Sequence, residues 1–451
     1  MRTNSSTPKG MRDFSPSVMY RRNYILSIIQ DTFDLFGFSP IETPSMENLD
    51  TLTGKYGEEG DRLIFKVLNS GDYLSKVDLK KEITSKLLTK EISDKALRYD
   101  LTVPFARYVA QNRNEIIFPF KRYQMQNVWR ADRPQKGRFR EFFQCDADFI
   151  GTDSLISEIE LILICDNVFN NLNIPNVEIS INNRKLLSGM IELMNANELF
   201  NDIVIILDKI DKIGIDKAKE EMLKIGISEE SLLLLDKFID VKDTTQLRDL
   251  ISASAIGVEG AEQLDFVINN IENLGLKGSK LKFDITLARG IDYYTGCILE
   301  VKQNDINVGS IVGGGRYDDL TSFFGLNNMS GVGISFGIDR IYIVMQELNL
   351  FPEIIDNRIK VMFANLGKKE SIFCLKLLKE LRENGVNSEI YPNNSKLKKQ
   401  MNYANKKGVK FVVIVGENEM NNNLIMVKEM STGFQSSILF SEFVNKIKNN
   451  V

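Results

Sequence analysis

The stretch from Ile117 to Ile150 constrains the fold most strongly, because its apolar and polar residues alternate with a period of two. The alternation is interrupted once, by the sequence Arg-Pro-Gln-Lys-Gly at 133–137. Since successive side chains of a β-strand point to opposite faces of the sheet, the pattern predicts a long antiparallel hairpin with two unlike faces. After the turn one face is mostly apolar, and the other is polar around a single aromatic ring, with Arg138, Arg140, Phe142, Gln144, Asp146 and Asp148.

The polar face of this hairpin allows two interpretations. An ordinary amphipathic sheet with one solvated face shows the same alternation. However, five of the eleven residues from Arg130 to Arg140 are lysine or arginine. Guanidinium groups bind phosphate oxygens in a bidentate manner, an aromatic ring offers a stacking surface, and amide and carboxylate groups select a polar ligand. The second interpretation is therefore a site for a nucleotide and a small polar molecule.

Periodicity also predicts the elements around the hairpin. The stretch from Leu187 to Gly278 follows a helical pattern and is rich in Leu, Ile, Asp, Glu and Lys, which predicts a helical insertion. The other predicted elements are a helix over 20–36 ending at Gly37, a strand over 38–43, a helix over 154–172, and strands over 176–181, 281–284 and 293–301.

The glycine run Gly313–Gly315 has two open interpretations. It is either a simple turn or a wall of a ligand pocket, where missing side chains let a ligand approach the backbone. A phosphate-binding P-loop is excluded, because no G-x-x-x-x-G-K-[ST] sequence occurs.

The C-terminal part of the chain follows a different pattern. After a predicted linker at 351–357, strand and helix patterns alternate, which predicts an α/β domain with a parallel sheet. Residues 358–451 carry 16 lysines and arginines and 8 aspartates and glutamates, a net charge of +8 in a chain of net charge −4. This charge indicates either a surface that meets a polyanion or an ordinary solvated lysine-rich surface.

Composition excludes several kinds of chemistry. The chain contains no histidine, so zinc sites built on histidine, Ser-His or Cys-His pairs and a histidine general base are all excluded. The four cysteines form no C-x-x-C pair, and no apolar run approaches the roughly 18 residues of a membrane span. The polar N-terminal residues resemble no signal peptide, so we expect a cytoplasmic protein without membrane association.

Four stretches of the chain resemble motifs of the histidyl-tRNA synthetases, a family of class II aminoacyl-tRNA synthetases. One is similar to the amino-acid-binding segment, one to motif 2, one to the signature peculiar to the family and one to motif 3; in chain order they are Leu97–Arg107, Val128–Phe142, Leu287–Gly296 and Gly331–Arg340. Motif 2 departs from the usual pattern at Ala131 and at Asp132, which stands in place of glutamate. The resemblance runs from Pro8 through nearly the whole chain.

This resemblance implies an α+β fold, in which a class II antiparallel-sheet catalytic domain carries a helical insertion and is followed by a C-terminal α/β anticodon-binding domain. The implied boundaries are 1–186 and 279–350 for the two parts of the catalytic domain, 187–278 for the insertion, 351–357 for the linker and 358–451 for the anticodon-binding domain. The stretch Tyr20–Pro44 resembles motif 1, which implies a homodimer interface, although a plain core helix has the same pattern.

The implied reaction is the ATP-dependent activation of L-histidine, followed by its transfer to the 3′ end of tRNA-His, with Mg²⁺ on the phosphates. Arg130 and Arg289 would be catalytic, at the α-phosphate and between that phosphate and the carboxylate. Arg138, Phe142 and Arg340 would complete the ATP site. The implied histidine-binding residues are Asp100 and Thr102 for the amino group, Gln144 and Arg289 for the carboxylate, and Asp148, Tyr293 and Tyr294 for the ring.

Two related kinds of protein share this resemblance without the activity. One is the regulatory subunit of ATP phosphoribosyltransferase, a non-catalytic relative that typically lacks the C-terminal domain and key motif residues. The chain keeps Arg130, Arg289, Arg340 and a basic C-terminal segment, which favours the enzyme. The other is a tRNA-sensing domain within a kinase, and the chain contains no kinase motif.

Overall fold

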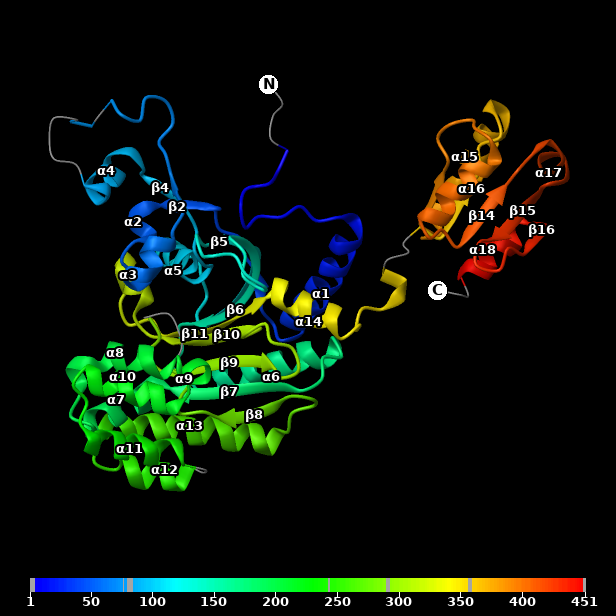
Figure 1. Ribbon diagram of the computed structural model, residues 1–451. Helices are drawn as coiled ribbons and strands as arrows, with labels where there is room; N and C mark the ends of the chain where they lie inside the picture. Colours follow the sequence, from blue (N-terminus) through cyan, green and yellow to red (C-terminus); the bar gives the residue numbers. More distant parts are fainter. Residues whose placement is uncertain are drawn as a thin grey trace. The chain divides into compact units, whose positions relative to one another are not determined.

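The computed structural model describes residues 5–75, 77–78, 84–241, 244–288, 293–355 and 359–448. The chain forms two compact units (Figure 1). The first unit comprises residues 1–15 and 22–350, and the second comprises residues 16–21 and 351–451. Each unit is built around its own β-sheet.

The first unit is organised by an eight-stranded sheet in the order β1-β5-β6-β11-β10-β9-β7-β8. All neighbouring strands are antiparallel except the pairs β1–β5 and β7–β8, which are parallel. In sheet order the bounds are Ser39–Pro40, Phe120–Trp129, Glu141–Ile150, Gly331–Gly337, Val312–Tyr317, Cys297–Gln303, Val177–Asn183 and Lys280–Phe283. A mainly antiparallel sheet with added helices confirms the predicted α+β class.

The predicted hairpin forms the first long pair of this sheet. Strands β5 and β6 pair from Phe120↔Ile150 to Trp129↔Glu141, and the predicted interruption falls in the turn between them. The apolar face packs into the core, where the Phe149 ring lies edge-on to the Phe38 ring at 5.1 Å between centroids. The two-residue period therefore predicted both the pairing and the buried face.

Helices cover the rest of the first unit. The predicted helices over 20–36 and 154–172 are confirmed as α1 (Pro16–Leu35) and α6 (Ile156–Asn171). The other helical elements of this unit outside the insertion are α2 (Leu49–Leu52), α3 (Gly57–Leu63), α4 (Ser85–Ile92), α5 (Thr102–Gln111), η2 (Leu320–Phe324) and α14 (Ile338–Glu347). A small sheet in the order β2-β4-β3 joins Met46–Asn48, Lys95–Leu97 and Lys66–Val67.

The predicted helical insertion is observed as a run of helices between β7 and β8. In chain order its elements are α7 (Arg184–Leu193), η1 (Asn197–Leu199), α8 (Phe200–Leu207), α9 (Ile210–Ile213), α10 (Ile215–Lys224), α11 (Glu229–Ile239), α12 (Thr244–Ile251) and α13 (Ala255–Leu274). Figure 1 shows α7, α11, α12 and α13 grouped near β7 and β8. Helices α7 and α13 approach closely because Gly189 and Gly257 face each other without side chains.

For the segment after the insertion, the structure decides between the two open interpretations of the glycine run and corrects one predicted strand. The glycine run Gly313–Gly315 is not a turn; it lies inside strand β10, between β9 and β11. The strand predicted over 293–301 begins only at Cys297, because Tyr293–Gly296 form a turn whose Thr295 amide donates to the carbonyl of Arg316 at 2.8 Å.

The second unit has the predicted alternation of strands and helices. Its five-stranded sheet has the order β13-β12-β14-β15-β16, with bounds Ser388–Ile390, Val361–Phe363, Phe411–Ile414, Leu424–Glu429 and Gln435–Leu439. The first three strands are parallel, as predicted, whereas β15 and β16 add an antiparallel hairpin that was not predicted. Helices α15 (Lys368–Glu383), α16 (Leu397–Lys406), α17 (Glu417–Asn422) and α18 (Phe440–Lys448) complete the unit, preceded by η3 (Glu353–Ile355).

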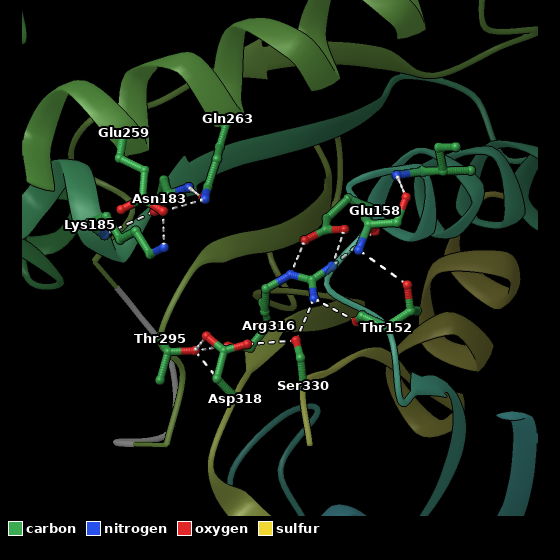
Figure 2. A network of polar contacts seen from close by, with 12 residues as sticks. Thr152, Glu158, Asn183, Lys185, Glu259, Gln263, Thr295, Arg316, Asp318 and Ser330 are labelled. Atoms are coloured by element: carbon green, nitrogen blue, oxygen red, sulfur yellow. Dashed lines mark hydrogen bonds and ion pairs between the residues drawn. The ribbon is translucent and has the colours of Figure 1, made fainter. Parts of the chain in front are cut away.

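A buried ion pair fixes the glycine-bearing strand β10 to helix α6 (Figure 2). Arg316 donates to both carboxylate oxygens of Glu158 at 2.6 Å, and its guanidinium also donates to the Ser330 hydroxyl at 2.7 Å. Asp318 accepts from Ser330 at 2.6 Å and from the Thr295 hydroxyl at 2.5 Å. The network therefore holds the turn that precedes β9 against the end of β10.

We expect Arg316→Met to lower the free energy of unfolding of the first unit by about 3 to 5 kcal/mol, because it leaves the buried Glu158 carboxylate without its partner. Urea unfolding followed by circular dichroism measures this loss. Lys282→Met is the matched control in the same unit, because Lys282 forms a solvent-exposed pair with Glu178 that contributes at most about 1 kcal/mol. Equal losses of unfolding free energy in the two variants would contradict a stabilising role of the buried ion pair between Arg316 and Glu158.

Candidate active site

A cavity of about 1280 Å³ lies over the polar face of the large sheet. Its floor comes from strands β6, β9, β10 and β11, and its walls come from the turn after β5, the start of α14 and helices α8 and α9. Arg130, Arg138 and Arg340 supply cationic groups to the lining, whereas Asp100 and Asp146 supply acidic ones. The cavity therefore offers a cationic region and an acidic region to the ligands that bind in it.

Strand register places the floor residues in rows across the sheet. Gln124 pairs with Asp146, Asp146 with Ser335, Ser335 with Gly313, and Gly313 with Glu300. Because these paired residues share a face, the row crosses five strands and carries polar side chains on four of them, with Gly313 leaving a gap on β10. Of this row, Asp146, Ser335, Gly313 and Glu300 line the cavity.

The glycines of β10 differ in what surrounds them. A Cβ atom on Gly314 would lie 2.3 Å from the carbonyl oxygen of Gly333, so this position accepts only glycine. A Cβ atom on Gly313 would meet nothing within 4 Å, and Gly313 lines the cavity. The missing side chain of Gly313 therefore leaves room for a ligand, whereas that of Gly314 lets two strands approach.

The cationic side chains are held by the backbone and by aromatic rings. Arg130 donates from Nε to the Tyr99 carbonyl at 3.1 Å, and its guanidinium carbon lies 4.2 Å from the Tyr99 ring centre and 5.2 Å from that of Phe142. Arg340 donates to the carbonyls of Gly137 at 3.0 Å and Ser310 at 2.6 Å. Both guanidinium groups are therefore oriented before any ligand binds.

The acidic region begins with Asp100, at the start of helix α5. Its carboxylate accepts from the hydroxyls of Tyr56 at 2.8 Å and Tyr293 at 3.1 Å, and from the amide of Val103 at 3.2 Å. Burial raises the pKa of Asp100, while the Tyr56 hydroxyl and the nearby Arg130 oppose the rise. Thr102 also lines the cavity here, so an ammonium group bound at this point would meet a carboxylate and a hydroxyl.

Asp148 lies deeper than the cavity lining. It is 2% exposed, and its Oδ2 lies 2.8 Å from Nη2 of Arg122, a fully buried residue directly opposite on β5. Its Oδ1 accepts from the Tyr317 hydroxyl at 2.6 Å. Burial raises the pKa of Asp148 against the effect of Arg122. The strand register puts Asp148 on the same face of the sheet as Gln144 and Asp146, but Arg122 and Tyr317 occupy its carboxylate and it is not among the residues that line the cavity.

All but two of the predicted site residues line the cavity. Those brought together are Asp100, Thr102, Arg130, Arg138, Phe142, Gln144, Tyr293, Tyr294 and Arg340. The two exceptions differ in kind. Asp148 is described but does not line the cavity, whereas Arg289 lies outside the described residues. Among the lining residues that were not predicted are Tyr56, Asp146, Glu300 and Ser335. Asp146 shares the face of Gln144, so the two-residue period was a signal for it, whereas no local motif marks Tyr56.

Asp146, which lines the cavity, is 2% exposed and has a strongly altered acidity. Burial raises its pKa from the ordinary value of 3.8 to about 7, against the effect of Arg122, and the neighbouring Asp148 adds to the rise. Between these two values the folded chain binds more protons than the unfolded chain. The contribution of Asp146 to the free energy of unfolding therefore falls as the pH rises from about 4 to about 7.

We expect Asp146→Asn to remove this loss, because the amide does not titrate. Relative to the unaltered chain, the variant should gain on the order of 2 kcal/mol in free energy of unfolding between pH 5 and pH 8. Urea unfolding at several pH values measures the difference between the two chains. A difference that stays constant over this range would contradict the prediction.

Among the described residues, no helix has both the length and the hydropathy of a membrane span. Within the same part of the chain, no group of three or more cysteine, aspartate or glutamate side chains has the arrangement of a metal site.

Comparison with known proteins identifies the family of this site. A family model described as "Histidyl-tRNA synthetase" matches residues 74–341, and one described as "Anticodon binding domain" matches residues 360–450. The histidine–tRNA ligase of Christiangramia forsetii is 52% identical over 451 residues, an alignment that covers 98% of this chain and 99% of that protein.

Solved structures agree with these matches. The crystal structure of histidyl-tRNA synthetase from Nostoc sp. PCC 7120 superposes with a TM-score of 0.83 at 30% identity and covers 100% of both chains. An ATP phosphoribosyltransferase regulatory subunit/histidyl-tRNA synthetase from Bacillus halodurans has a TM-score of 0.72 at 19% identity, which shows the fold alone. Full-length similarity, two matching family models and the arrangement of the cavity together show that the chain belongs to the histidyl-tRNA synthetase family.

Proposed function

We propose that this chain is a histidine–tRNA ligase that activates L-histidine with ATP, releases pyrophosphate and transfers the histidyl group to the 3′ end of tRNA-His. The observation that carries the proposal is the convergence in one cavity of Arg130, Arg138 and Arg340 with Asp100 and Asp146, which come from separated segments. ATP and histidine together carry phosphates, a carboxylate and an ammonium group. Such a ligand pair needs both regions of the cavity.

The ATP side of the cavity is proposed to be its arginine-lined region. Arg130 would bind the α-phosphate, where negative charge accumulates as the histidine carboxylate attacks. Arg138 would bind the outer phosphates, and the adenine would stack between Phe142 and Arg340. The guanidinium of Arg130 already lies near the Phe142 ring, which supports a common binding region for phosphate and base.

The histidine side of the cavity is proposed to be its acidic region. Asp100 and Thr102 would bind the ammonium group, and Gln144 the carboxylate, together with Arg289. The imidazole would lie toward Tyr293 and Tyr294, whose rings pack edge to face at 5.0 Å between centroids. Asp148, on the same face of the sheet as Gln144 and Asp146, would contribute to ring recognition from beyond the cavity lining, through a shift of its side chain or through a bridging group.

The remaining partners are proposed from the same family. ATP would enter as its magnesium complex, with the ion carried by the phosphates as part of the substrate. The domain boundaries given above are retained, with residues 358–451 binding the anticodon of tRNA-His. We also propose a homodimer formed through the Tyr20–Pro44 segment, a cytoplasmic location and no association with membranes.

The non-catalytic alternative, a regulatory subunit of ATP phosphoribosyltransferase, is not favoured. The relative from Christiangramia forsetii is a histidine–tRNA ligase that matches nearly the whole chain, and the matched anticodon-binding region supports a role with tRNA. The described motif arginines Arg130, Arg138 and Arg340 all line the cavity. A protein that only bound histidine would not need a phosphate region of this kind.

The activation step is tested by ATP–pyrophosphate exchange with the purified full chain. We expect exchange that depends on histidine and that other amino acids do not support, because unpaired polar groups in the site would reject them. A folded chain that binds histidine but shows no exchange would overturn the enzyme assignment. Exchange that occurs equally well with other amino acids would overturn the proposed substrate.

A further inference from the structure

The N-terminal residues Pro8–Phe14 form a strap against the cavity wall. The described residues of the strap lie in turn and extended backbone, outside any helix or strand. The strap is joined to the start of β6 by a hydrogen bond from the Arg140 amide to the Gly10 carbonyl at 2.9 Å. A Cβ atom on Gly10 would lie 2.9 Å from the side chains of Arg140 and Pro134, so the strap packs closely on this turn.

Arg12 connects the strap to two separate walls of the cavity. Its guanidinium carbon lies 3.1 Å from the centre of the Phe139 ring, and its Nη2 donates to Oδ1 of Asp339 at 2.5 Å. Phe139 and Asp339 both line the cavity, although they are separated by 200 positions in the chain. One side chain therefore spans from the turn before β6 to the start of helix α14.

Arg12, Phe139 and Asp339 form a junction between the strap, the turn before β6 and the start of α14. Asp339 receives further hydrogen bonds that make this junction rigid. Arg22 donates to its Oδ1 at 2.6 Å, and the amide of Phe143 on β6 donates to its Oδ2 at 3.3 Å. Asp339 is 5% exposed, so these contacts are largely shielded from water. Charge-assisted hydrogen bonds of this kind are about twice as strong as neutral ones.

The junction lies directly beside the residues proposed to hold the nucleotide. Arg340 follows Asp339 in the chain, and Phe142 precedes Phe143, so fixing Asp339 against the Phe143 amide sets the separation of the two side chains. Arg340 also donates to the Gly137 carbonyl at 3.0 Å, which ties it to the same turn. A shift of this junction would change the gap between Phe142 and Arg340 without altering Asp100 or Thr102.

We propose that Arg12 is a positioning residue for the nucleotide region of the cavity, acting through Phe139 and Asp339 on the gap between Phe142 and Arg340. The proposal rests on the proposed function only for the identity of the nucleotide as ATP. It does not place Arg12 in contact with a ligand. Loss of Arg12 should therefore affect the ATP side of the cavity and spare the histidine side, whereas a general effect on folding would affect both sides.

The test compares the unaltered chain with Arg12→Ala and Arg12→Lys in ATP–pyrophosphate exchange, with each substrate varied in turn. We expect Arg12→Ala to raise KM for ATP by about ten-fold and to leave KM for histidine within about two-fold, because small misplacements of binding groups are costly. Arg12→Lys should restore part of the ATP affinity, since it keeps the charge near Asp339 but loses the planar group on Phe139. Arg113→Ala, which removes an exposed arginine, is the control for charge and should match the unaltered chain.

An unchanged KM for ATP in Arg12→Ala, or a parallel rise of both KM values, would overturn the proposal. If Arg12→Ala does not fold, Phe139→Leu removes the ring beneath the guanidinium and should produce the same selective loss. Calorimetric titration with ATP gives the dissociation constant directly and does not depend on turnover. An inactive unaltered chain would therefore overturn the proposed function, whereas equal ATP dissociation constants with and without Arg12 would overturn the positioning role alone.

Discussion

Arg130→Ala should lower kcat for histidine-dependent pyrophosphate exchange by about 10²- to 10³-fold, the effect typical of losing one preorganised donor to developing charge. The guanidinium lines the cavity, where the Tyr99 carbonyl and the Tyr99 ring orient it. A phosphate bound in the cavity would meet this preorganised positive charge. Exchange rates at saturating ATP and histidine measure the effect.

Arg130→Lys separates charge from geometry in this prediction. Lysine keeps the positive charge but presents a single ammonium group in place of the planar fork, so it should recover only part of the rate. Loss of the bond to the Tyr99 carbonyl should cost about 1 kcal/mol of unfolding free energy, which leaves the chain folded at room temperature. A rate in Arg130→Ala within about three-fold of the unaltered chain would contradict a role at the reacting phosphate.

Gly313→Val should abolish most of the activity while leaving the fold intact. The added side chain points into the cavity, where a Cβ atom meets nothing within 4 Å, and valine is well suited to a β-strand. We expect kcat/KM for exchange to fall by roughly 100-fold, because the side chain occupies space that the substrates need. Gly313→Ala, with a smaller group, should show an intermediate loss.

Gly314→Val is the matched comparison for this effect. At this adjacent position a Cβ atom would lie 2.3 Å from the Gly333 carbonyl oxygen, so the substitution should disrupt the sheet itself. Thermal unfolding should therefore be nearly unchanged in Gly313→Val and strongly lowered in Gly314→Val. Retained activity in folded Gly313→Val would show that the substrates do not pass over β10.

The polar face of the hairpin was predictable from sequence because its signal is local. A period of two fixes which side chains share a face, so the sequence alone predicts that Phe142, Gln144 and Asp146 lie together. Motif resemblance, and not periodicity, assigns Arg130, Arg138 and Arg340 to the site. Their convergence required the antiparallel pairing of β6 with β11, which no short stretch of sequence encodes.

Other features of the site depend on contacts between distant segments. Tyr56 reaches Asp100 across 44 positions, and Arg12 reaches Asp339 across 327, so neither contact leaves a periodic trace. The glycine run was ambiguous because glycine is common both in turns and where strands or ligands approach closely. The engagement of Asp148 by Arg122 follows from their pairing across β5 and β6, which only the strand register reveals.

The most direct test of the whole account is attachment of radiolabelled histidine to purified tRNA-His by the full chain with ATP. The account predicts acid-precipitable histidyl-tRNA that requires ATP and does not form on a tRNA for another amino acid. Failure to form histidyl-tRNA, with a folded chain that binds both ATP and histidine, would contradict the account.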